Sequence, residues 1–141
     1  MQIFATSPNP FESAESLRHD KKRRGKMILE TAQVLCTALS DYCRVPYKPT
    51  HRNHPIMKWC KESSSNFIWL VFYAHRLEDI RIEEGDNPHK SMEVINKIKD
   101  YFDYLPQNSG TPFANCTPYK DLPVHEAYRK YLAEKQTSFT L

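Results

Sequence analysis

The sequence predicts an all-α protein: a compact single-domain bundle of about five helices joined by long proline-marked loops. The chain of 141 residues contains three glycines and ten prolines, which disfavours a sheet-rich fold with many tight turns at positive φ. Apolar residues recur at three- and four-residue spacing in several segments, as expected of helices. A chain of this length fits one domain, residues 1–141, whose core needs no metal or disulfide staple.

The first elements are expected in the N-terminal third. Residues 2–6 fit a short extended segment, and the prolines of residues 7–10 predict a loop. A short helix is expected over about residues 11–19, after which Gly25 kinks or breaks the path. The clearest helix follows over about residues 26–43, and it is expected to be mostly buried because apolar side chains cover more than half of its circumference. Its narrow polar stripe holds Lys26, Glu30, Gln33 and Thr37.

The later elements follow from a polar loop that ends in Pro55. Proline suits the first turn of a helix, so we expect a short helix there, capped by Asn53 or His54. Aromatic residues over 66–83 recur at helical spacing, which favours a place in the core over a base-stacking platform. The remaining periodicity predicts helices over residues 66–83, 90–104 and 124–136, with a loop over residues 106–123.

Charge is unevenly distributed along the chain. Residues 1–61 hold eleven Lys/Arg and five Asp/Glu, a net charge of +6, whereas residues 62–141 hold nine and twelve, a net charge of −3. Such asymmetry is typical of a protein whose basic side meets a polyanion, and a solvated charged face is the alternative.

A basic cluster at residues 18–26 is the first candidate site. Cationic side chains displace the counterions condensed on DNA, a gain that does not depend on base sequence and weakens with salt. The residues expected to bind nucleic acid here are Arg18, Lys21, Lys22, Arg23, Arg24 and Lys26.

Glu30 is the second candidate. A carboxylate so close to the basic cluster repels DNA unless it has a task, such as general acid/base catalysis or stabilisation of a cationic intermediate. The alternative is a surface glutamate paired with Lys26 one turn earlier on the helix.

The third candidate is the loop before Pro55, which is dense in hydrogen-bond donors and opens a helix. It suits capture of a phosphate or a polar base edge, by Lys48, His51, Arg52, Asn53 and His54. Zinc is the rival interpretation, since His51 and His54 with His75, His89 or Cys60 supply ligand types. These residues lack a recognised metal spacing, so we predict no metal and no cofactor.

The chain shows neither a signal-peptide pattern nor a run of eighteen apolar residues, so no membrane partner and a cytoplasmic location are expected. The four cysteines form no C-x-x-C pair and are expected to be reduced thiols. The oligomeric state is left open.

Several segments together carry a resemblance to a known family. They are Asp20-Lys21, residues 26–35, residues 47–55, Trp59, residues 113–117 and residues 127–131. With these segments the chain resembles a family of uncharacterised tailed-phage proteins, and the resemblance covers most of its length.

Members of that family are distantly similar to the pyrimidine-dimer DNA glycosylases of phages, small helical enzymes that excise damaged bases and cut the strand by β-elimination. The resemblance implies a catalytic glutamate on a buried early helix, matched by Glu30, and a basic-polar segment near Asn53. It also implies an N-terminal α-amine as nucleophile, freed by methionine removal.

The sequence departs from that pattern at three positions. Gln2 is too large for ordinary methionine removal, and Leu29 and Gln33 stand where those enzymes have arginines. The nucleophile is then the Met1 amine or a lysine such as Lys22 or Lys26, unless catalysis has been lost.

The first hypothesis is a DNA glycosylase/AP-lyase-like enzyme acting on a damaged or modified base. A non-catalytic phage DNA-binding protein is the alternative, and a nucleotide-level enzyme that uses residues 51–54 is a third.

Overall fold

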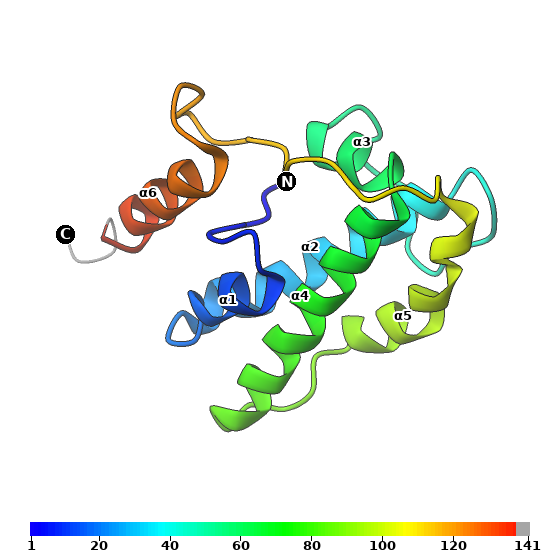
Figure 1. Cartoon of the computed structure of the whole chain (residues 1–141). Helices are drawn as coiled ribbons and strands as arrows, with labels where there is room; N and C mark the ends of the chain where they lie inside the picture. The colour runs from blue at the N-terminus through cyan, green and yellow to red at the C-terminus, as the bar shows by residue number, and fades with distance from the viewer. Residues whose placement is uncertain (138–141) are drawn as a thin grey trace.

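The computed structural model describes residues 1–137, and within them every regular element is helical. The all-α prediction is therefore confirmed. The elements are α1 (Pro10–Glu15), α2 (Lys21–Leu39), α3 (Pro55–Lys61), α4 (Ser64–Glu83), α5 (Ser91–Ile98), a 3₁₀ helix η1 (Lys99–Tyr104) and α6 (Val124–Thr137). Figure 1 shows α2 and α4 crossing at the centre, with α1, α3 and α5 around them and α6 to one side.

Helix α2 begins five residues earlier than predicted and runs straight through Gly25. The Asp20 side chain accepts a hydrogen bond from the Arg23 N–H and caps the helix there, so the expected break at Gly25 was wrong. A Cβ at position 25 would lie 3.2 Å from Nη1 of Arg81. Glycine therefore serves a close approach between α2 and α4 rather than a kink.

The other predicted helices are present with shifted ends. Helix α1 stops at Glu15 rather than near residue 19, and α4 begins at Ser64 because the Ser63 hydroxyl accepts from the N–H groups of Ser65 and Asn66. The helix predicted over residues 90–104 is α-helical to Ile98 and then tightens into η1. His54, one of the two proposed caps, accepts from the Ile56 N–H and starts α3.

The N-terminal segment has no regular secondary structure and is buried between helices. The Ala5 N–H donates to the Ile3 carbonyl at 3.1 Å, so the segment turns and is not extended as predicted. Residues 3–6 are each less than a tenth exposed. From α6, His125 Nδ1 lies 2.7 Å from the Ala5 carbonyl oxygen and Arg129 donates to the Thr6 carbonyl at 2.9 Å. From α4, Trp69 donates to the Pro8 carbonyl at 2.7 Å. These contacts fix the start of the chain in the centre of the molecule, where Figure 1 marks it between α6 and α3.

One hydrophobic core joins these elements, from Ile3 in the N-terminal segment to Leu132 in α6. Its largest fully buried side chains include Tyr73, Tyr128 and Phe67. Of the α4 aromatics, Phe67 and Tyr73 belong to the core as predicted and Trp69 packs against it, whereas the prediction was wrong for Phe72, which is 47% exposed. None of the helices in residues 1–137 is long and apolar enough to cross a membrane. All four cysteines are free thiols.

Candidate active site

Glu30 lies on the side of α2 that meets the N-terminal segment, not in bulk water. It is only 7% exposed. Its Oε1 accepts a hydrogen bond of 3.0 Å from the backbone N–H of Gln2. The buried N-terminal segment therefore holds residue 2 directly against the glutamate.

A cavity of about 380 Å³ opens beside Glu30. Its walls come from the N-terminal segment, the first three turns of α2, and α6. The charged residues that line it are Lys22, Arg23, Lys26, Glu30 and Lys135, and Phe4, Met27 and Tyr131 supply apolar surface. Four cations therefore surround one carboxylate, a combination suited to an anionic ligand that reacts at an acidic group.

Two buried polar atoms at this cavity lack a hydrogen-bond partner among the described residues. They are Oε2 of Glu30 and Nε2 of Gln2. Leaving a buried polar atom unpaired costs about 1–3 kcal/mol, and such groups in folded proteins often belong to functional sites. The free oxygen of Glu30 is therefore the feature of this cavity that most needs an explanation.

Burial and the neighbouring groups shift the pKa of Glu30 in opposite directions. Burial raises the pKa of Glu30 above its ordinary value, and this effect outweighs the Gln2 N–H, Lys26, the α-amino group of Met1 and His51, which all lower it. A carboxylate with a raised pKa is a stronger proton acceptor than an ordinary glutamate, which suits general base catalysis.

The candidate nucleophiles Met1, Lys22 and Lys26 all line this cavity. The α-amine of Met1 and the Lys26 ammonium are both close enough to Glu30 to influence its pKa. The structure thus brings together the three residues predicted to be catalytic, Glu30, Met1 and Lys26.

The loop before α3 also reaches this site. His54 accepts the Ile56 N–H through Nδ1 at 3.2 Å, which leaves Nε2 to carry the proton, and the ring hydrogen-bonds the Met1 backbone. Burial lowers the pKa of His54, and the Met1 α-amine and His51 lower it further. His54 is therefore a neutral ring that helps to hold the first residue.

The predicted basic cluster at residues 18–26 does not act as one surface. Arg24 is only 3% exposed, forms an ion pair with Asp86, and donates to the Arg18 carbonyl at 2.6 Å. Its inclusion among the nucleic-acid-binding residues was wrong, because a side chain enclosed between α2 and the Asp86 turn presents no surface to a phosphate.

Arg18, Lys21 and Arg23 are also engaged with carboxylates. Arg18 pairs with glutamates 15, 83 and 84 at 2.9–3.6 Å. Lys21 lies 3.2 Å from Asp86, and Arg23 lies 2.9 Å from Asp20 while also lining the cavity. Of the cluster, the cavity receives Lys22, Arg23 and Lys26, whereas Arg18 and Lys21 lie outside it.

The remaining predicted binding residues follow the α3 side of this face. His51, Arg52, Asn53 and Lys48 are exposed, and His51 is near enough to Glu30 to affect its pKa. His51 adopts a left-handed backbone with φ of 50°, a conformation that histidine tolerates better than most side chains. The described residues contain no cluster of three or more metal-binding side chains.

Five residues that line the cavity were not predicted as site residues from the sequence: Gln2, Phe4, Met27, Tyr131 and Lys135. The rings of Phe4 and Tyr131 are 6.0 Å apart, so α6 and the N-terminal segment close one wall together. Tyr131 and Lys135 are one turn apart on α6, which is the only sequence signal that pairs them.

Comparison with family models, with curated proteins and with solved structures finds no match to this chain. The functional interpretation therefore depends on the geometry of the cavity.

Proposed function

We propose that the cavity beside Glu30 is the active site of a DNA glycosylase/AP-lyase-like enzyme that forms an imine with deoxyribose C1′. The observation that carries the proposal is the buried Glu30 oxygen without a partner, in a cavity that also holds amines and several cations. The family resemblance in the sequence points to the same reaction class.

The proposed reaction uses an amine of the cavity as nucleophile, either the Met1 α-amine or a lysine such as Lys26. Its lone pair attacks C1′ of a damaged nucleotide, and the base leaves with the electrons of the C1′–N bond and a proton from the amine. The sugar ring then opens, because the remaining nitrogen lone pair forms the C=N bond as the C1′–O4′ bond breaks and O4′ takes up a proton. At an abasic aldehyde, attack and loss of water give the same protonated imine. The amine must be uncharged to attack, because only its neutral form has a free lone pair.

Glu30 is proposed to act on the cationic intermediate. Its ionised form stabilises the protonated imine, and its free oxygen accepts the C2′ proton. The electrons of that C–H bond then expel the 3′-phosphate, which completes β-elimination without any oxidant or reductant. The cations around the cavity suit the phosphates that flank the reacting sugar. Reaching the sugar requires the damaged nucleotide to leave the base stack.

The direct test is reduction of the imine with borohydride. The protein is incubated with duplex DNA containing one abasic site, and in parallel with ultraviolet-irradiated DNA, and covalent adducts are resolved by electrophoresis. We expect an adduct whose peptide map places the deoxyribose remnant on Met1, Lys22 or Lys26. Intact-mass analysis of the untreated protein establishes whether its N-terminus carries a free α-amine. Absence of an adduct on every substrate would overturn the proposal.

A second candidate function is a non-catalytic DNA-binding protein, favoured by the exposed cations of the α3 side. That function needs the basic side chains but not Glu30. It predicts salt-dependent DNA binding that survives substitution of Glu30, with no trapped adduct.

A further inference from the structure

A second hollow lies between the C-terminal end of α2 and α3. Its volume is about 210 Å³. The polar side chains that line it include Arg52, Asn53, Lys58 and Lys61. Among the described residues that line it there is no Asp or Glu, so its chemistry suits a phosphate group.

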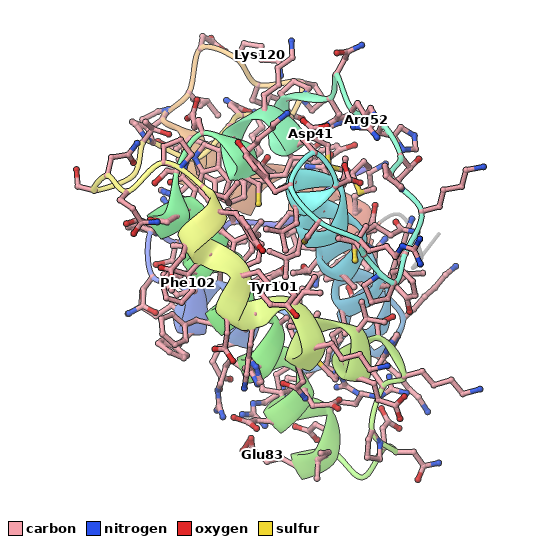
Figure 2. All side chains as sticks on the ribbon, turned by 90° about the vertical axis from the view of Figure 1, so that its right-hand side faces the viewer. Asp41, Arg52, Glu83, Tyr101, Phe102 and Lys120 are labelled. Carbon is pink, nitrogen blue, oxygen red and sulfur yellow. The ribbon has the colours of Figure 1, made fainter. Side chains whose placement is uncertain are left out.

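Asp41, just outside this hollow, organises two of the cations. Arg52 Nη1 lies 3.2 Å from one carboxylate oxygen, and the Lys61 ammonium hydrogen-bonds the other. Lys61, and then Arg52, hold the pKa of Asp41 below its ordinary value. Figure 2 shows Asp41 and Arg52 at the same end of α2. Lys58 is the third cation. Arg52, Lys58 and Lys61 together with Asp41 carry a net charge of +2, which remains available to an anion.

One loop connects this hollow with the Glu30 cavity. The Thr37 hydroxyl, on the polar stripe of α2, accepts the Thr50 N–H at 3.1 Å and so fixes the loop. The next residue, His51, is close enough to Glu30 to affect its pKa, and the two after it line the second hollow.

The two hollows lie beside different turns of the same helix. Glu30 and Thr37 lie on the same stripe, seven residues apart, which corresponds to about 10 Å along α2. Successive nucleotides of one DNA strand advance by about 3.4 Å along the duplex axis. A duplex whose axis runs along α2 would therefore place the second hollow about three nucleotides from the Glu30 cavity.

We propose that the hollow formed by Arg52, Asn53, Lys58 and Lys61 binds a DNA backbone phosphate about three nucleotides from the reacting sugar. The distance from a reacting sugar rests on the proposed function. The phosphate site itself does not, and DNA binding alone tests it. Arg52 and Asn53 were predicted from the sequence to bind nucleic acid. Lys58 and Lys61 are additional binding residues that the sequence pattern did not indicate.

The first measurement is the salt dependence of DNA binding by fluorescence anisotropy, with a labelled duplex of about 20 base pairs, two helical turns. The double variant Lys58→Gln/Lys61→Gln is compared with Lys90→Gln/Lys97→Gln, which removes the same charge from the residue before α5 and from α5 itself, neither of which lines either hollow. Loss of the one phosphate contact should lower the slope of log Kobs against log salt by about 0.9. The control should keep the wild-type slope. Equal slopes for the two double variants would overturn the proposal.

A variant of opposite sign keeps the test decisive if the double variant folds poorly. Asp41→Asn removes the competing carboxylate and leaves all three cations in place. We expect it to bind the same duplex more tightly than wild type, by roughly threefold to tenfold, because it removes a negative charge that repels the DNA phosphate. Unchanged or weaker binding by folded Asp41→Asn would contradict a phosphate in this hollow.

Substrate length separates failure of this site from failure of the catalytic proposal. On a long abasic duplex, borohydride trapping at low protein concentration should be weaker for Lys58→Gln/Lys61→Gln than for wild type. On an abasic oligonucleotide trimmed to one phosphate on each side of the lesion, the two proteins should trap equally. If trapping is absent everywhere while the anisotropy slopes still differ, the phosphate site stands and the enzymatic proposal fails.

Discussion

Two glutamates in the first thirty residues lie beside cations, and they differ in almost every physical respect. The carboxylate of Glu15 accepts hydrogen bonds from Arg18 and Arg76, and its side chain remains 40% exposed. These arginines lower the pKa of Glu15 to about 2. Glu15 is thus a fully paired member of an ion network that joins α1 to α4.

Glu30 has the opposite character. It is buried, one of its oxygens has no partner among the described residues, and burial raises its pKa. Several cations line the neighbouring cavity, yet no donor within residues 1–137 hydrogen-bonds its second oxygen. The difference shows that an acid beside basic residues is structural when its oxygens are satisfied, whereas an unsatisfied buried acid indicates a site for a ligand.

The largest expected effect separates the two glutamates by activity. Glu30→Gln should reduce strand cleavage of abasic DNA by β-elimination by roughly a thousandfold, about 4 kcal/mol, because it removes the acceptor of the C2′ proton. Glu15→Gln is the matched control and should cleave as wild type does. Equal strand cleavage by wild type and Glu30→Gln would remove Glu30 from the chemistry.

The next effect tests whether the buried arginine of the ion network is structural. Arg24→Ala should lower the free energy of unfolding by about 3 kcal/mol, because it leaves Asp86 partly buried without its enclosed partner. Lys21→Ala removes the other cation at Asp86, but this lysine side chain is 79% exposed, so less than about 0.5 kcal/mol is expected. Urea denaturation measures both, and similar losses for the two variants would refute an enclosed structural role for Arg24.

A smaller effect is the decrease in the free energy of unfolding that results from ionising the buried Glu30. A raised pKa means that the folded state binds more protons than the unfolded state, so stability falls as pH rises from the ordinary value of 4.5 through the raised pKa. Glu30→Gln avoids this loss and should be about 1 kcal/mol more stable than wild type above that window. Below pH 4.5 the two proteins should converge. Denaturation across pH checks this, and a destabilised Glu30→Gln at pH 8 would contradict it.

The smallest effect is the acid sensitivity of the Glu15 network. The pKa of Glu15 lies at about 2, below its ordinary value of 4.5. Its stabilisation is therefore fully present above pH 4.5 and is lost as pH falls towards 2. Because the side chain is exposed and screened by solvent, the contribution is less than about 1 kcal/mol. Glu15→Gln should be slightly less stable than wild type at pH 7 and equal to it near pH 2, as thermal unfolding would show.

The fold was largely predictable because its signals are local. Apolar spacing located α2, α4 and α6, and Pro55 marked the start of α3. The errors were at helix ends, where a cap decides the boundary. Asp20 is an ordinary capping residue, yet Gly25 was taken as a break because the close approach of Arg81 that it permits comes from residues far along the chain.

The candidate site was predictable in part. Glu30 was identified from its narrow polar stripe, and the loop before α3 from its density of donors. The partners of the basic residues were not predictable, since Asp86 lies 62 residues from Arg24. Lys135 and Tyr131 reach the cavity from the other end of the chain, so no local pattern relates them to Glu30.

The sequence by itself determined that the protein is helical, that α2 carries a polar stripe with a carboxylate, and that cations concentrate in the first half. These properties depend on periodicity and composition along a short stretch of chain. Only the tertiary structure decided which charges are satisfied, because pairing depends on segments brought together by burial of the core. That pairing enclosed Arg24 against Asp86 and left one oxygen of Glu30 without a partner, beside the start of the chain.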